Sequence, residues 1–347
     1  MLSARENYLQ LLRYGVSERL VNQYEPFGLI PFPYRVKDNG SPGTEFLDTW
    51  GVTMSWPAGE VGCTPIINNK TKVCPDITQW ERYIKAPDLK LPNSEWVPYQ
   101  QMAASVDRKE QFLTCSAGIG LFERLHHLMG FEDTLVNFLL EPEDMHELLD
   151  YITQWRIEYF RELINHMHPE YILSHDDWGT KDRLFMSPEI WREFFKERYQ
   201  KIYRSIREQG VRIIHHADSF LMPIANDLAD LEIDVWQGVL PQNDISALQK
   251  SLAGKVVLMG GIDVSVIDTE HWTRELVARE VEHVCREYVP GGWFIPCMTY
   301  GGIGSVFPGV YEAVSAEIKR QSSSNESIEW SCEDGNSEKE TSPVPFG

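Results

Sequence analysis

The sequence predicts a single (β/α)8 barrel of parallel strands with helices outside, and two observations carry this prediction. From Gln111 onward, short runs of β-forming residues alternate with helical segments, the pattern of parallel strands joined by crossover helices. Several of these runs end in reactive or polar residues, as in YILSHDDWG, VRIIHHADSF, VVLMGGIDV and WFIPCMTYGG. The carboxyl ends of parallel barrel strands meet at one face, so these residues are expected to surround one pocket.

The elements can be placed in order along the chain. Residues 1–110 are rich in Pro, Gly and Trp and are predicted to form an irregular N-terminal part with short strands and loops. A strand at 111–118 precedes a helix closed by Gly130, and a long helix runs from Pro142 to about Met167. Further strands are predicted at 171–177, 211–218, 233–239, 256–263 and 291–297, and further helices at 187–210, 221–231, 244–254, 273–289 and from about 308. No GxGxxG motif follows a strand, which argues against a dinucleotide-binding fold.

The end of the chain differs in composition from the barrel. After about Gln321 the sequence is polar, acidic and poor in aliphatic residues, so burial cannot offset the entropy of ordering it. The predicted organisation is therefore one barrel domain over 1–321 and a disordered tail over 322–347.

Composition narrows the class of protein. The 347 residues carry a net charge of −20, which disfavours binding to nucleic acid or to an anionic membrane. The chain starts with a charged amphipathic segment and contains no run of about 18 apolar residues. Its six cysteines show no C-x-x-C spacing, which predicts a reducing, cytoplasmic location. Barrels of this size commonly dimerise, so a homodimer is one possible state, but the sequence does not determine the oligomeric state.

Three strand-end residues have the chemistry of zinc ligands. His216 and Asp218 stand two apart, so their side chains leave the strand on the same side, and Cys297 ends a later strand. Imidazole, carboxylate and thiolate all bind zinc, and three protein ligands leave one position open for a substrate. The residue types alone leave open the alternative that Cys297 is a small buried apolar residue.

Two adjacent aspartates are candidates for acid–base catalysis. Asp176 and Asp177 point to opposite sides of their strand, so one can face the pocket as a general acid while the other binds a helix N-terminus. The alternative is that one of them caps the following loop. His215 is expected to point away from His216.

Other residues are candidates for substrate binding. Asp48 lies beside Trp50, an environment suited to a cationic group, although a turn aspartate is the plainer interpretation. Arg35 can bind an anionic group or remain a surface arginine. The remaining candidates on the predicted pocket face are Trp178, Asp263 and Tyr300.

These motifs, in their order, resemble the uroporphyrinogen decarboxylase superfamily. The resemblance rests on SHDDWGTKDRLFMSPEIWREFFKERY, on the long stretch from HHADSF to VVLMGGID, and on WFIPCMTYGGIGSVFPGVYEA. RENYLQLLRYG and DTWGV fit the same superfamily, so that the resemblance covers nearly the whole chain except the tail. It implies a single β/α barrel.

The resemblance implies one of two chemistries. The decarboxylases hold their tetrapyrrole with an arginine-rich segment, whereas the corresponding GLIPFPYRVKDNG contains only Arg35. The methylcobamide-dependent methyltransferases bind zinc through an H-x-C pair and a later cysteine, which here become His216, Asp218 and Cys297. The sequence therefore favours a zinc-assisted methyltransferase that moves a methyl group between a small O-, N- or S-methylated substrate and a corrinoid protein. A cofactor-free decarboxylase using Asp48, Asp176 or Asp177 and a non-catalytic ligand-binding barrel are the alternatives.

Overall fold

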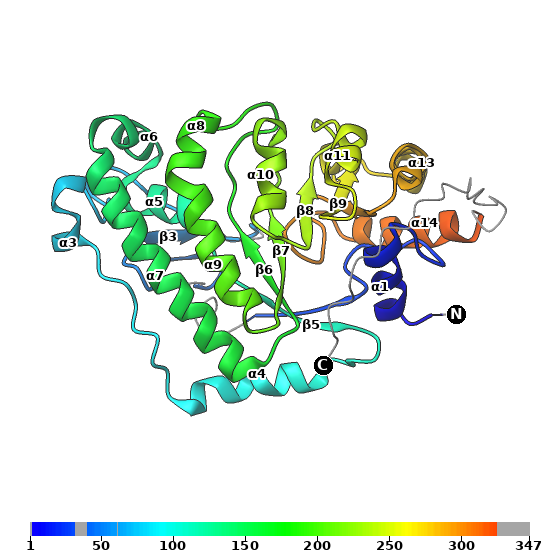
Figure 1. The fold of residues 1–347 in the computed structure, drawn as a ribbon, viewed down its shortest axis with the longest axis horizontal. Coiled ribbons are helices and arrows are strands. Elements are labelled where there is room, and N and C mark those ends of the chain that lie inside the picture. Colours follow the sequence, from blue (N-terminus) through cyan, green and yellow to red (C-terminus); the bar gives the residue numbers. More distant parts are fainter. Residues whose placement is uncertain (1, 32–39, 61, 325–347) are drawn as a thin grey trace, which may run out of the picture.

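Seven parallel strands form the main sheet in a computed structural model, which describes residues 2–31, 40–60 and 62–324 (Figure 1). Their order is β1-β5-β6-β7-β8-β9-β10, and every neighbouring pair is parallel. The strands are β1 (Phe27–Ile30), β5 (Phe112–Ser116), β6 (Tyr171–His175), β7 (Arg212–His216), β8 (Val235–Val239), β9 (Val257–Ile262) and β10 (Phe294–Met298). The sheet curls into a partial barrel, so the predicted α/β class is confirmed, while an eighth strand does not occur within the described ranges.

The helices lie outside the curled sheet (Figure 1). The longer ones are α1 (Ala4–Tyr14), α4 (Asn93–Ser105), α5 (Leu121–Met129), α6 (Phe131–Leu140), α7 (Pro142–Met167), α9 (Glu197–Arg207), α11 (Ile245–Leu252), α13 (Arg274–Tyr288) and α14 (Val310–Ser324). The short helices α8 (Pro188–Trp191), α10 (Ala225–Asp230) and α12 (Val264–Ile267) complete the connections. No helix in the described part of the chain is both long and apolar enough to cross a bilayer.

Local sequence signals set several helix ends. Pro142 occupies the first position of α7, where its missing N–H costs nothing, and the Ser187 hydroxyl accepts from the Ile190 backbone N–H at the start of α8. Gly130 closes α5 at a φ of 97°, a conformation that favours glycine. These ends agree with the predicted boundaries.

The core has an inner and an outer layer because side chains alternate along each strand. Tyr171 and Leu173 of β6 belong to the cluster inside the curled sheet, whereas Ile172 packs in the outer cluster beneath the helices. The same alternation continues to the strand ends. It places His175 and His216 on the inner side and directs His215 to the outer layer, where its Nδ1 bonds the Tyr203 hydroxyl at 2.6 Å.

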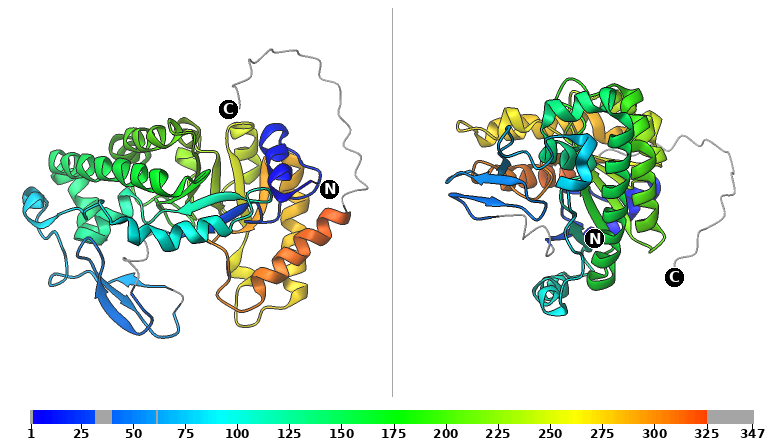
Figure 2. Two further views of the ribbon diagram at one scale, coloured as in Figure 1. Left: turned by 90° about the horizontal axis from the view of Figure 1, so that it is seen from below. Right: turned by 90° about the vertical axis from the view of Figure 1, so that its left-hand side faces the viewer.

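The N-terminal part is more regular than expected. It contains β1 of the main sheet and a separate antiparallel sheet of β2 (Thr44–Leu47), β3 (Thr53–Trp56) and β4 (Thr64–Pro65), which stands to one side of the main body (Figure 2). The β1 strand has only four residues, FGLI, and α4 rather than a directly following helix leads to β5. The alternation of strands and helices along the sequence therefore does not reveal the β1 strand. The predicted disordered tail begins too early at 322, because residues 322–324 continue α14, and its remainder from 325 onward lies outside the described residues.

The segment before β1 bridges the two edges of the sheet. Buried Gln23 accepts from the Met298 N–H at 3.3 Å and donates through Nε2 to the Ser315 hydroxyl at 2.7 Å. The Tyr24 hydroxyl donates to the Tyr300 carbonyl at 2.8 Å. These bonds connect the β1 edge to the end of β10 where an eighth strand would close a complete barrel.

Replacing Gln23 tests this bridge. We expect Gln23→Ala to lower the free energy of unfolding by about 1–3 kcal/mol, because it leaves a buried N–H and hydroxyl without their partner. Urea denaturation would measure the change. Gln209→Ala is the matched control, since exposed Gln209 lies in the turn after α9 and its side chain bonds the nearby Ser205 carbonyl, and its effect should stay within about 0.5 kcal/mol. Equal effects of the two substitutions would refute the bridge.

Candidate active site

Two histidines from neighbouring strands and one aspartate meet at the carboxyl ends of β6 and β7. His175 and His216 are register partners, and their rings lie 4.6 Å apart between centroids. Asp177 follows β6, and its Oδ2 lies 3.1 Å from His175 Nε2. One possible ligand atom from each of these three residues lies within 4.8 Å of the other two, so they can share one metal ion.

Each histidine is oriented through its second ring nitrogen. The Nδ1 of His216 lies 2.5 Å from the Gln237 Oε1, so Nδ1 carries the proton and Nε2 keeps a free lone pair. The Nδ1 of His175 lies 3.6 Å from the Glu123 Oε2. Metal-binding histidines are typically held in this way by a carbonyl or carboxylate behind the ring.

The aspartate is held in a similar way. The Oδ1 of Asp177 accepts from the backbone N–H of Asp218 at 2.9 Å and from the Ser219 hydroxyl at 3.2 Å. Its Oδ2 is the oxygen directed towards His175. Hydrogen bonds from behind therefore fix His216 and Asp177, while His175 has the Glu123 carboxylate behind it at ion-pair distance.

The cluster is strongly acidic for a buried site. Burial opposes protonation of His175, but the carboxylates of Glu123 and Asp177 raise its pKa to about 9. Burial raises the pKa of Glu123 to about 7, and burial and nearby Asp177 raise the pKa of Asp218 to about 7. Burial and the charge of His175 lower the pKa of His216 to about 4, so His216 is a neutral potential ligand.

This donor set fits a divalent metal ion. Two imidazoles and one carboxylate form the protein part of many catalytic zinc sites, and the same set also suits other first-row metals. The carboxylates around His175 stabilise positive charge at this position. Three protein ligands would leave a position open for a substrate atom.

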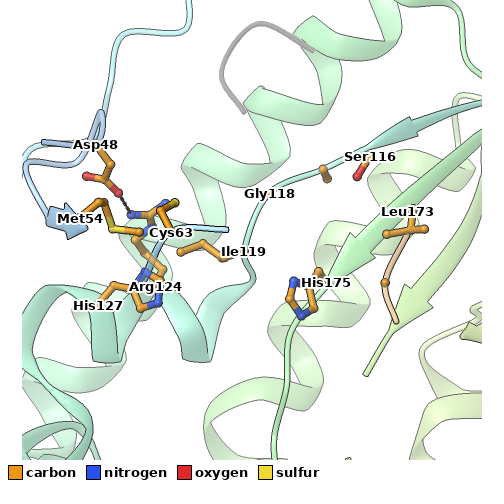
Figure 3. Close-up of a pocket in the computed structure, with 12 residues that line it drawn as sticks. Asp48, Met54, Cys63, Ser116, Gly118, Ile119, Arg124, His127, Leu173 and His175 are labelled. Atoms are coloured by element: carbon orange, nitrogen blue, oxygen red, sulfur yellow. Dashed lines mark hydrogen bonds and ion pairs between the residues drawn. The ribbon is translucent and has the colours of Figure 1, made fainter. Parts of the chain in front are cut away.

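A cavity of about 200 Å³ opens beside the cluster. Figure 3 shows His175 on one side of it and the Asp48–Arg124 ion pair on the other. Gly301 also lines the cavity, and a Cβ atom at this glycine would lie 3.1 Å from the His216 ring, so the absence of a side chain lets the loop approach that ring. The polar side chains that line the cavity are Asp48, Cys63, Ser116, Arg124, His127 and His175.

Asp48 occupies the turn between β2 and β3. Its Oδ1 accepts from the Trp50 and Val52 N–H groups, and its Oδ2 accepts from Arg124 Nη1 at 2.7 Å. Both partners of this ion pair are buried, and the Arg124 guanidinium also lies 5.0 Å from the Trp50 ring centroid. The charge of Asp48 is thus already balanced within the protein.

The predicted zinc ligands are only partly brought together. His216 belongs to the cluster, and the Asp218 backbone supports Asp177, but neither the Asp218 carboxylate nor Cys297 is part of the His175–Asp177–His216 group. Fully buried Cys297 packs among apolar side chains inside the sheet, and burial raises the pKa of its thiol well above the usual range. The Gln237 amide bonds the His216 ring and partly offsets the rise in the pKa of this thiol, so it lies between two of the predicted ligands.

Asp176 and Trp178 are placed in the interior. Asp176 is fully buried and accepts from the Phe122 and Glu123 N–H groups, the Trp178 indole and the Tyr199 hydroxyl. It therefore anchors the start of α5, while neighbouring Asp177 faces the cluster. Trp178 is fully buried as well and stacks on His215.

The remaining predicted residues, Asp263, Tyr300 and Arg35, are not part of the His175–Asp177–His216 cluster. The Asp263 carboxylate caps α12, and the Tyr300 carbonyl accepts from Tyr24 and Gln237. Arg35 lies outside the described residues. The sequence interpretation assigned no role to Glu123, Arg124 or Gln237 because they lie inside elements whose pattern shows only helix or strand.

Comparisons with known proteins agree with this architecture. A methyltransferase from Methanosarcina mazei superposes with a TM-score of 0.63 at 12% identity, covering 92% of this chain and 99% of that chain. A D-psicose 3-epimerase from Clostridium cellulolyticum H10 reaches only 0.38 at 6% identity, over 67% of this chain and 84% of that chain. No curated protein matches the sequence. Residues 50–296 match the family described as uroporphyrinogen decarboxylase (URO-D), and the chain belongs to this family.

Proposed function

We propose that this protein is a metal-assisted methyltransferase that moves a methyl group between a small methylated substrate and a corrinoid carried by a partner protein. The observation that carries the proposal is the His175–Asp177–His216 cluster, whose ligand atoms are oriented from behind and which borders a cavity. The fold shared with the M. mazei methyltransferase and the family resemblance support the methyl-transfer chemistry.

The residues have distinct parts in this proposal. His175, His216 and Asp177 would hold the ion, with zinc as the leading candidate, and a bound ion would polarise the atom that the methyl group leaves. Glu123 and Gln237 keep the two imidazoles aimed at the ion. Asp218, whose carboxyl pKa is raised to about 7 by burial and by Asp177, can hold the proton that the leaving group needs.

The cavity favours this function over tetrapyrrole decarboxylation. A volume of about 200 Å³ suits a small substrate and is below the roughly 300–1,000 Å³ of pockets for drug-sized ligands. Asp48, the candidate for stabilising a protonated ring, already receives two backbone N–H groups and a guanidinium. A ring N–H would have to displace one of these donors.

The activity can be tested with free cobalamin in place of the partner protein. Purified protein is mixed with cob(I)alamin and a panel of O-, N- and S-methylated small molecules, and the absorbance change to methylcobalamin is followed. We expect methylation with at least one compound and a loss of at least about 100-fold in Asp177→Asn. Turnover of uroporphyrinogen with no methyl transfer would instead establish the decarboxylase.

The ligand set predicts which substitutions remove the metal. Outer-shell losses typically weaken metal affinity 10–100-fold, so losing a ligand in Asp177→Asn should weaken it at least about 100-fold. Asp234→Asn is the matched control: it should lower the free energy of unfolding by about 1–3 kcal/mol but keep the metal in the folded protein, because the buried Asp234 carboxylate bonds Arg207, Arg212 and the Ile213 N–H at the opposite end of β7. Zinc per protein, measured by plasma emission after gel filtration, and urea denaturation distinguish the two.

Cys297→Ser separates the two possible ligand sets. If His175, Asp177 and His216 hold the ion, this substitution leaves the zinc content unchanged. Loss of zinc in Cys297→Ser together with retention in Asp177→Asn would instead establish His216, Asp218 and Cys297 as the ligands.

Metal affinity should rise with pH. His175 has a pKa of about 9, so at neutral pH a metal ion must displace its proton. We expect the apparent zinc affinity to increase roughly tenfold per pH unit up to about pH 9, and calorimetry in buffers of different ionisation enthalpy should show proton release. An affinity independent of pH would exclude His175 as a ligand.

A further inference from the structure

A second feature of the molecule, unrelated to the metal cluster, is the guanidinium of Arg156 inside the protein. Arg156 lies on α7 and is only 3% exposed. Its Nη1 donates to the Ile119 carbonyl at 2.5 Å. Its Nε and Nη2 are buried and have no hydrogen-bond partner among residues 2–31, 40–60 and 62–324.

Such a group needs an acceptor. An arginine stays protonated inside a protein, so it cannot escape the cost of burial by losing its charge. A buried donor of this kind without a partner costs several times what an ordinary hydrogen bond contributes. The orphaned N–H groups of Arg156 therefore point to an acceptor that the protein itself does not supply.

The nearby carboxylates are engaged elsewhere. The charges of Asp176 and Arg156 both act on the Tyr199 hydroxyl, so Asp176 is near, but its four donors are Phe122, Glu123, Trp178 and Tyr199. Asp48 on the other side pairs with Arg124. Neither carboxylate bonds the Nε or Nη2 of Arg156.

A small chamber lies in front of this guanidinium. It measures about 20 Å³, room for a single atom or group of the size of a water molecule. Trp50, Gly118, Arg124, Trp155, Arg156 and Tyr159 line it. Gly118, Ile119 and Arg124 line the main cavity as well, so the chamber and the cavity share a wall.

We propose that this chamber is a binding site for one small monovalent anionic group, held by Arg156 and Arg124. The N–H groups of Arg156 that lack an acceptor, together with the guanidinium of Arg124, present hydrogen-bond donors and positive charge to the chamber, which an anionic group satisfies better than water does. Trp50 and Trp155, whose ring centroids lie 4.9 Å apart, form aromatic walls of the chamber. The anionic group can be a free halide or one oxygen of a carboxylate whose ligand extends from the adjoining main cavity.

Anomalous diffraction tests the site directly. Crystals of the full chain are soaked in sodium bromide, or in formate, without any other ligand. A bromine peak within hydrogen-bond distance of Arg156 Nε or Nη2 supports a free-anion site. Formate density at that position with no bromine peak supports a site for a carboxylate. Water or empty density in both crystals overturns the proposal.

Thermal unfolding gives a second readout in solution. The wild type is unfolded at constant ionic strength while gluconate is replaced by bromide or formate. Once the concentration of bromide or formate exceeds its dissociation constant, each further tenfold increase should raise the melting temperature by about 2–4 °C. Arg156→Met should remove this dependence. Arg161→Gln, an exposed change on the same helix, should keep it.

Arg156→Lys covers the case in which the methionine variant does not fold. It retains the positive charge but lacks the Nε and Nη2 donors, so the anion dependence should weaken at least about tenfold. An anion dependence equal in the wild type and both Arg156 variants would refute the assignment. These measurements need no metal and no methyl transfer, so their outcome is independent of the proposed function.

Discussion

The buried carboxylate of Asp176 is the interaction on which the rest of the site depends. It joins the end of β6 to the first turn of α5 and to Tyr199 of α9 through three hydrogen bonds, and a fourth comes from the Trp178 indole. A side chain at Gly120 would collide with it, since a Cβ there would lie 2.3 Å from the carboxylate. Because β6 is fixed in this way, the next residue, Asp177, must point to the opposite side, towards His175 and His216.

The same constraint explains how distant elements reach the cluster. Fixing the start of α5 places Glu123 behind His175 and Arg124 opposite Asp48. On the other side, Gln237 of β8 holds His216 and also bonds the carbonyl of Tyr300, at the start of the loop that carries Gly301. The site is therefore built by side chains that do no chemistry themselves but fix the orientation of those that can.

The sequence predicts the regular part of this structure well and the site less completely. Strands from β5 to β10 and their helices follow from periodicity and caps such as Pro142 and Gly130, which are local signals. The pairing of His175 with His216 depends on the register between two strands, and the position of Gln237 depends on a third. Spacing within one strand led to the prediction of His216 and Asp218 as joint ligands. It cannot show which residue a neighbouring strand places beside His216.

The distribution of charged side chains around the cavity can orient a bound ligand. Asp177 and Asp218 follow β6 and β7, and Glu123 of α5 lies beside them next to His175, whereas the guanidiniums of Arg124 and Arg156 line the chamber between α5 and α7. A cation is favoured beside the carboxylates and an anionic group beside the guanidiniums, although the chain as a whole carries −20. A small ligand that enters this field has one preferred orientation. In a ligand that has a negative group, this group faces the guanidiniums. Another electron-rich atom of the same ligand can then face the histidines.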